Sequence, residues 1–164
     1  MQRFDEIVRN VKRKFDDARR RDRGLVCKQG AYGGSIVLKL QKRSWTNDSM
    51  RQVPSQTGIF FSVWLDKVDA KKNRANYNIH ALKLRQLRAY RLTSNEFATD
   101  FRHAFKKFGS AWPNVSVNYG PQTLMQGWIE IHARHFERDV LDLLNRFEKL
   151  SPIIDDLLAQ RRTP

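Results

Sequence analysis

Residues 58–68, GIFFSVWLDKV, form the most strand-like stretch of the chain and decide the class of its fold. Successive side chains of a β-strand point to opposite faces of a sheet, so alternate residues share one face. One face here is apolar and consists of Ile59, Phe61, Val63 and Leu65. The other face carries Phe60, Ser62 and Trp64. This pattern is typical of an antiparallel sheet that packs its apolar face against helices.

A second strand is predicted over residues 35–45, SIVLKLQKRSW, after a turn over residues 30–34. A shorter candidate strand, residues 25–29, precedes that turn. The alternation places Ile36, Leu38 and Leu40 toward the helices. It places Lys39, Arg43 and Trp45 on the outer face or at the rim, where they would contribute to a basic surface.

The remaining elements complete an α+β fold. Apolar residues at helical spacing predict an N-terminal helix over 2–22, a central helix over 94–108 and a C-terminal helix over 135–150, with a short helix restarting at Pro152. Residues 69–78 are expected to form a loop. Residues 79–86 fit either a strand or a helix, and the strand is preferred. Residues 123–132 are predicted to form the last strand. We therefore expect a mainly antiparallel sheet of about four to five strands against N-terminal, central and C-terminal helices. One domain would span 1–160, followed by a frayed tail over 161–164.

Composition indicates a cytoplasmic protein. The chain has 164 residues and one cysteine, Cys27, which excludes an internal disulfide and a cysteine-based zinc site. Residues 1–20 lack the apolar run of a signal peptide, and no stretch reaches the roughly 18 apolar residues of a membrane-spanning helix. We expect no membrane association.

The basic charge is unevenly distributed along the chain. The formal net charge is +14, and residues 1–50 and 51–110 contribute +7 and +8, whereas residues 111–164 contribute −1. A domain of this charge attracts polyanions. The alternative is a solvated basic surface that only keeps the protein soluble.

Basic residues mixed with aromatic ones form the candidate binding site. Single-stranded nucleic acid binds to positive grooves that follow its phosphates and to aromatic faces that stack its bases. The candidates are Arg19, Arg20, Arg21 and Arg23 after the first helix, Lys39, Arg43 and Trp45 on the second strand, and Lys71, Lys72 and Arg74 after residues 58–68. Trp45 and Trp64 could stack bases or could be covered by a helix, and the sequence leaves both possibilities open.

No motif indicates catalysis or a cofactor. His132, His135 and Glu137 have ligand chemistry suited to zinc. A strand-to-helix transition would separate the two histidines, and the neighbouring Arg134 and Arg138 would repel a cation. Cys27 is expected to pack as a small apolar residue, and there is neither a nucleophile elbow nor a phosphate loop. We expect no enzyme activity and no cofactor or metal, although a site assembled from distant residues would leave no local motif.

The order of elements resembles the bacterial DUF4304 family of uncharacterised small α+β proteins. The matching positions are Leu40, Gln41, Lys42, Ser44 and Trp45, followed by residues 60–66, within a resemblance that covers roughly residues 1–150. The chain departs from the family pattern at Asp66 and in its high charge. The resemblance implies a fold and a bacterial cytosolic setting, and it implies no settled activity.

Three functional hypotheses follow from these observations. The first is a non-catalytic basic protein that binds nucleic acid through its Lys/Arg-rich surface. The alternative is a bacterial immunity protein or antitoxin that binds and neutralises an acidic toxin domain, with charge steering the association. The third is an enzyme for an anionic substrate, which would require a pocket with converging polar groups near His132 or His135.

Overall fold

Five strands form one antiparallel sheet in which each strand pairs with its neighbours in the sequence. The computed structural model describes residues 2–18, 24–50 and 56–164, and the strand order is β1-β2-β3-β4-β5. The strands are β1 (Leu25–Tyr32), β2 (Ser35–Lys42), β3 (Gly58–Leu65), β4 (Arg74–Leu82) and β5 (Thr123–Glu130). This sheet and the helices that pack on it confirm the predicted α+β class.

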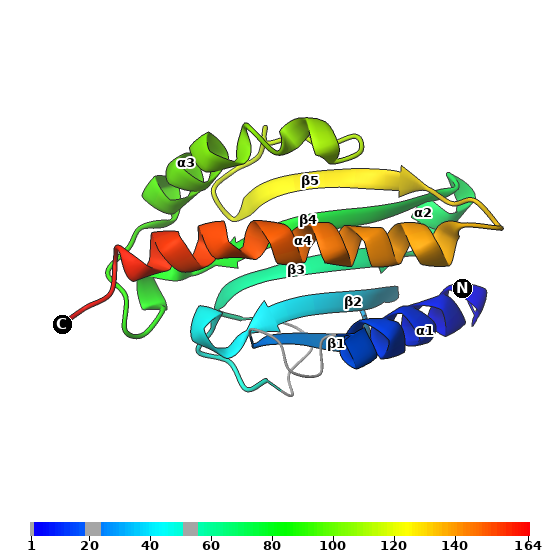
Figure 1. The fold of residues 1–164 in the computed structure, drawn as a ribbon, viewed down its shortest axis with the longest axis horizontal. Helices are drawn as coiled ribbons and strands as arrows, with labels where there is room; N and C mark the ends of the chain where they lie inside the picture. Colours follow the sequence, from blue (N-terminus) through cyan, green and yellow to red (C-terminus); the bar gives the residue numbers. More distant parts are fainter. Residues whose placement is uncertain (1, 19–23, 51–55) are drawn as a thin grey trace.

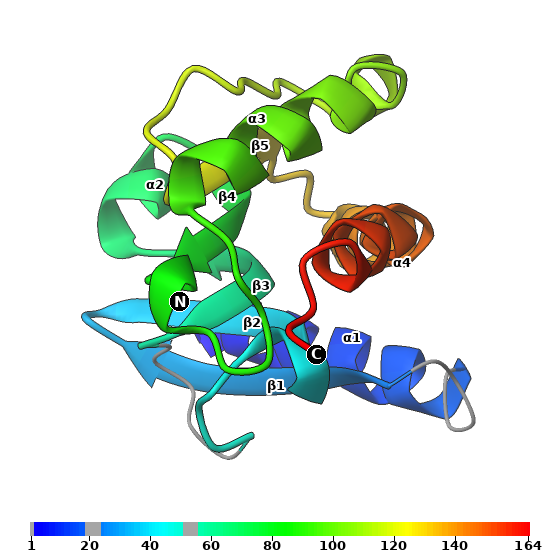
Figure 2. The ribbon, with the colours of Figure 1, turned by 90° about the vertical axis from the view of Figure 1, so that its left-hand side faces the viewer.

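Helices cover one face of the sheet. They are α1 (Gln2–Ala18), α3 (Ser94–Phe105) and α4 (Phe136–Ala159). The short helix α2 (Lys67–Lys71) connects β3 and β4, and the chain also has the 3₁₀ turns η1 (Arg43–Trp45), η2 (Leu84–Gln86) and η3 (Gly109–Ala111). The long helix α4 crosses in front of the strands, and α1 lies beside β1 and β2 (Figures 1 and 2). The central helix α3 packs against α4 and β5.

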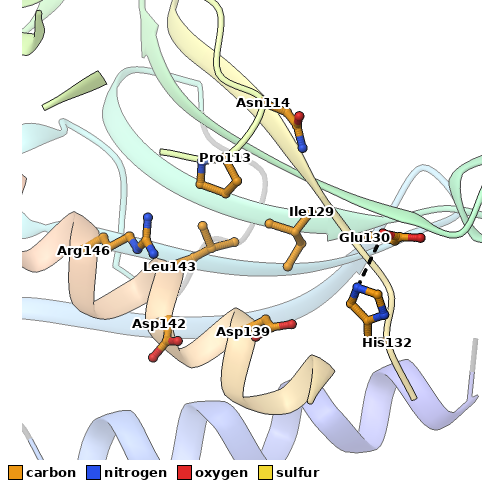
Figure 3. Close-up of a pocket in the computed structure, with 9 residues that line it drawn as sticks. All are labelled: Pro113, Asn114, Ile129, Glu130, His132, Asp139, Asp142, Leu143 and Arg146. Atoms are coloured by element: carbon orange, nitrogen blue, oxygen red, sulfur yellow. Dashed lines mark ion pairs between the residues drawn. The ribbon is translucent and has the colours of Figure 1, made fainter. Parts of the chain in front are cut away.

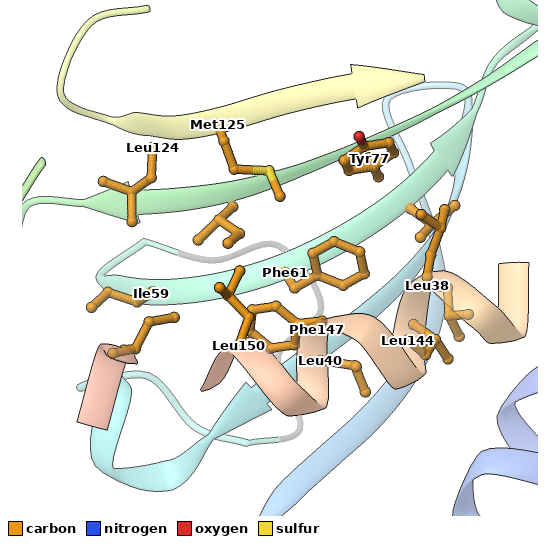
Figure 4. Packing of buried hydrophobic residues seen from close by; sticks show 14 of the residues in the cluster. Leu38, Leu40, Ile59, Phe61, Tyr77, Leu124, Met125, Leu144, Phe147 and Leu150 are labelled. Carbon is orange, nitrogen blue, oxygen red and sulfur yellow. The ribbon is translucent and has the colours of Figure 1, made fainter. Parts of the chain in front are cut away.

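The core lies between the sheet and α4, as the alternating pattern predicts. Phe61 stacks on Phe147 of α4 with a centroid separation of 4.7 Å (Figure 4). Leu38 and Leu40 of β2 lie opposite Val63 and Phe61 of β3, and all of these side chains are fully buried. The apolar faces predicted for these two strands are therefore confirmed.

Strand boundaries differ from the prediction at both ends of β4. This strand begins at Arg74, inside the predicted loop, and ends at Leu82 rather than at residue 86. Its alternation is hidden in the sequence because its outer residues include two asparagines and its inner residues include Ala75 and Tyr77. The short helix α2 was also not predicted, and Asp66 caps it by accepting a hydrogen bond from the Asp69 amide at 2.8 Å.

Helix α4 continues through Pro152, which corrects the prediction of two separate helices. Proline has no amide hydrogen, so the carbonyl of Glu148, four residues earlier, loses its usual helical donor. The Ser151 hydroxyl replaces that donor with a hydrogen bond of 2.7 Å to the Glu148 carbonyl. Ser151 is buried, so the bond is shielded from water and helps the helix pass the proline.

Replacing Ser151 by Ala should lower the free energy of unfolding by about 1–2 kcal/mol, because a buried carbonyl is left without a donor. The matched background is Pro152→Ala, which restores a backbone amide that can reach the same carbonyl. Urea denaturation of the two single variants and the double variant tests this account. An equal cost of Ser151→Ala in both backgrounds would show that the hydroxyl does not replace the missing amide.

The C-terminal residues are hydrogen-bonded, although we expected them to be frayed. The amide of Arg91 donates to the carbonyl of Arg161 at 2.7 Å, and the amide of Thr163 donates to the carbonyl of Ala89 at 2.9 Å. These bonds hold the end of the chain against the segment between β4 and α3. In the described part of the chain, no helix combines the length and apolar character needed to cross a bilayer.

Candidate nucleic-acid interface

The sheet face that points away from α1 and α4 carries polar and aromatic side chains in rows. One row crosses all five strands, because strand register places its members directly opposite one another. The polar row consists of Lys28, Lys39, Ser62, Asn78 and Gln126. Lys39, Ser62 and Asn78 of this row are buried, so the middle of the outer face is not a solvent-exposed surface.

Hydrogen bonds fix the middle of the polar row. The Ser62 hydroxyl donates to Asn78 Oδ1 at 2.7 Å, and Asn78 Nδ2 lies 2.7 Å from His80 Nε2. His80 Nδ1 lies 3.3 Å from the carbonyl of Gln122, which can only accept, so Nδ1 carries the proton and Nε2 accepts from Asn78. Burial lowers the pKa of His80, which favours this neutral form.

Lys39 is buried, which corrects the prediction that it lies exposed on the outer face. Its side chain does point to that face, but it is only 1% exposed, and its Nζ lies 4.7 Å from the ring centroid of Phe60. Desolvation, followed by the charge of Lys28 on the adjacent strand, lowers the pKa of Lys39 to about 8. Lys39 is therefore not available as a surface contact in this conformation.

A second row of the same face contains two partly exposed tryptophans. Trp64 of β3 lies opposite Asn76 of β4, and Asn76 lies opposite Trp128 of β5. Strands two apart in a sheet are separated by about 10 Å, so the two indole side chains flank Asn76 at that spacing. We call these three residues the tryptophan row.

Arg74, at the start of β4, contacts the tryptophan row. Its guanidinium carbon lies 3.8 Å from the ring centroid of Trp128, which is a close cation–π contact. The preceding residue, Asn73, has a positive φ of 57° and turns the chain from α2 into the strand. Lys71 ends α2 and Lys72 lies in this turn, and both are exposed, as is Arg74.

Strand register therefore brings Arg74, from one of the three predicted basic groups, next to a partly exposed aromatic ring. Within the described residues, Lys71, Lys72 and Arg74 form no ion pair. Sequence reasoning missed Trp128 and its part in this site. The alternation of Gln126 and Trp128 with buried neighbours on β5 was the available signal for its outward orientation.

Trp45 lies in the core, so the prediction that it faces outward is wrong. The chain leaves β2 after Lys42 and turns through η1, which directs the indole inward. Trp45 is fully buried, its Nε1 donates to Asp155 Oδ1 at 2.8 Å, and its ring meets Phe147 edge-on. It cannot stack a base in this conformation.

Arg43 is not part of the tryptophan row. Arg43 is exposed in η1, beyond the end of β2. Residues 19–23, which include Arg19, Arg20, Arg21 and Arg23, lie outside the described residues. The binding role predicted for these positions stays a prediction.

A pocket of about 230 Å³ lies between β5 and α4 and includes His132 in its lining. Its centre is formed by Ile129 and Leu143, which point toward one another, whereas Asp142 points away from that centre (Figure 3). His132 Nε2 lies 3.4 Å from a carboxylate oxygen of Glu130 at the rim. The polar groups of this pocket do not converge on one point.

His132 and His135 contact each other, and Cys27 lies in the core. The rings of His132 and His135 stack at a centroid separation of 5.7 Å. No group of three or more His, Cys, Asp or Glu side chains within the described ranges is arranged to hold a metal ion. Cys27 is buried, and desolvation raises the pKa of its thiol to about 12, which suits the apolar packing predicted for it.

Comparisons with protein-family models, curated proteins and solved structures give no match to this chain. The resemblance to the DUF4304 family therefore stays an expectation, and the functional argument depends on the geometry of the site.

Proposed function

We propose that the protein binds single-stranded nucleic acid on the outer face of its sheet, with bases stacked on Trp64 and Trp128. The observation that supports this proposal is the tryptophan row, in which two partly exposed indoles lie two strands apart with Arg74 stacked on one of them. Sheet-borne aromatic residues that stack unpaired bases are a recurring mode of single-strand recognition.

The polar groups near the tryptophans suit the other parts of a nucleotide. Asn76 lies between the two indoles and offers both a donor and an acceptor to a base edge. Arg74, two residues before Asn76 on β4, supplies positive charge beside the same row, and the exposed Lys71 and Lys72 precede it in the chain. Paired bases inside a duplex cannot reach the indole faces, so single strands should bind more tightly than duplexes.

Replacing Trp128 by Ala should weaken binding of a labelled single-stranded oligonucleotide by about 5- to 150-fold, because stacking one base contributes about 1–3 kcal/mol. Trp64→Ala should have an effect in the same range. Fluorescence anisotropy at low salt measures these affinities. The control is Tyr32→Ala, which removes an exposed aromatic ring from β1, outside the tryptophan row.

Three results of this experiment would contradict the proposal. They are the absence of binding by the wild-type protein at low salt, equal affinity for duplex and single strands, and an unchanged affinity in both tryptophan variants. Binding that decreases in Trp128→Ala but is retained in Trp128→Phe would show that an aromatic face is what the site requires.

Replacing Arg74 by Ala should weaken binding of every single-stranded sequence alike and reduce the slope of log affinity against log salt by about one, because one phosphate contact is lost. Titrations at several salt concentrations measure the slope. Arg74→Lys is the matched control, because it retains the charge and loses the planar stacking on Trp128. A slope that is unchanged in Arg74→Ala would contradict the assigned phosphate contact.

A further inference from the structure

The segment between β4 and α3 presents a second basic surface at the opposite end of the sheet from Arg74. Leu84 and Leu87 of this segment are buried and anchor it to the core. Lys83, Arg85 and Arg88 alternate with these leucines and are exposed. The apolar anchors therefore force the basic side chains outward.

Hydrogen bonds hold this segment in place. The Asn47 side chain donates to the carbonyl of Gln86 at 2.6 Å and accepts from the amide of Arg88 at 2.9 Å. The C-terminal residues pair with the next part of the segment, and Arg162 lies over the ring of Tyr90 at 5.9 Å. Three parts of the chain that are distant in sequence thus meet at this end, which faces the viewer in Figure 2.

We define the basic end surface as six exposed residues: Arg43, Lys83, Arg85, Arg88, Arg91 and Arg162. None of the six forms an ion pair with a described residue. Three carboxylates on the adjoining elements already have other partners. Asp155 binds Lys42 and Trp45, and Glu96 and Asp100 bind Arg161. The surface therefore retains a concentrated positive charge that a polyanion would neutralise.

The basic end surface and the tryptophan row lie near opposite ends of β4. Asn76 lies in the tryptophan row, and β4 ends six residues later at Leu82, which corresponds to about 20 Å along the strand. We propose, on the basis of the function proposed above, that the basic end surface binds the phosphate backbone of the same nucleic acid. Tight binding then requires a strand long enough to contact both ends of β4.

The test compares a labelled tetranucleotide, which is too short to reach both surfaces, with a labelled single strand of 20 nucleotides. The double variant Arg85→Glu and Arg88→Glu should weaken binding of the longer strand about tenfold or more and should lower its salt slope by about two. Binding of the tetranucleotide should stay within about twofold of wild type, because the Debye length near physiological salt is about 8 Å.

The matched control is the double variant Lys106→Glu and Lys107→Glu, which makes the same change of charge at exposed positions after α3. If the control variant weakened binding of the longer strand as much as the double variant Arg85→Glu and Arg88→Glu does, a general charge effect would explain the result and the inference would be overturned. The same holds if Arg85→Glu and Arg88→Glu weakened binding of both oligonucleotides equally. An unchanged affinity of the Arg85→Glu and Arg88→Glu double variant for the longer strand would also overturn the inference. In that case, weaker binding of both oligonucleotides by Trp128→Ala would still support the tryptophan site. No effect of Trp128→Ala on either length would instead count against the proposed function.

Discussion

Replacing Trp45 by Ala should lower the free energy of unfolding by about 3–5 kcal/mol, the range for removing a large aromatic side chain from a core. Trp45 is fully buried and packs edge-on against Phe147 of α4. Its Nε1 also donates to Asp155, so the variant leaves that carboxylate with one partner fewer. The substitution therefore removes both apolar contacts and a link between η1 and α4.

The backbone around Trp45 leaves little room for the structure to adjust to this loss. Gly58 has a φ of +112°, and a Cβ added there would lie 2.1 Å from the carbonyl oxygen of Trp45. Urea denaturation followed by far-ultraviolet circular dichroism measures the change. The control is Trp45→Phe, which retains an aromatic ring but not the hydrogen bond and should cost less than Trp45→Ala. A cost below about 1 kcal/mol for Trp45→Ala would contradict its place in the core.

Replacing Lys39 by Met should raise the free energy of unfolding at pH 7 by about 1–3 kcal/mol, because it removes a charge that is costly to bury. Lys39 is 1% exposed and lies opposite Lys28 on the adjacent strand. Its pKa is about 8 in the folded protein and 10.5 for the free side chain. A methionine fills similar space without the charge.

The same difference in pKa predicts how stability depends on pH. Between about pH 8 and pH 10.5 the unfolded chain still holds the proton of Lys39, whereas the folded protein has lost it. The unfolded state binds more protons in this window, so the free energy of unfolding rises with pH across it. Below pH 8 the penalty for the buried charge is fully present.

Urea denaturation at pH 7, 8, 9 and 10 measures this contribution. The part of the pH dependence due to Lys39 should be missing in Lys39→Met, so the curves of the variant and the wild type should approach each other above pH 8. The control is Lys106→Met, at an exposed position, which should change neither the stability nor its slope. A variant less stable than wild type at pH 7, with an unchanged slope, would contradict the account of Lys39.

The alternation in residues 58–68 predicted both faces of β3, because inward residues are apolar and the partner strand repeats the pattern. The same argument failed for β4, where the outward residues include two asparagines and the inward residues include Ala75 and Ala81. Pairing with β3 and β5 determines which side chains of β4 face the core, and local sequence does not show this pairing. Its start at Arg74 depends on the turn after α2, which local apolar spacing does not indicate.

The candidate site was only partly predictable for the same reason. Lys71, Lys72 and Arg74 were identified by their charge, but the position of Arg74 beside Trp128 depends on the pairing of β4 with β5. Trp45 was misplaced because alternation was extended past Lys42, where the strand ends and η1 reverses the orientation of the side chain. The alternation of residues predicts which face a side chain occupies only within the strand, and β2 ends at Lys42.

The most direct test of the central claim is a nuclear magnetic resonance titration that follows the indole Nε1–H signals. The chain has four tryptophans, which single Trp→Phe variants can assign. Adding single-stranded RNA or DNA should shift the signals of Trp64 and Trp128 and leave those of the buried Trp45 and Trp112 in place. A titration in which Trp64 and Trp128 do not shift, while the protein still binds the oligonucleotide, would contradict the assignment of the outer sheet face as the binding surface.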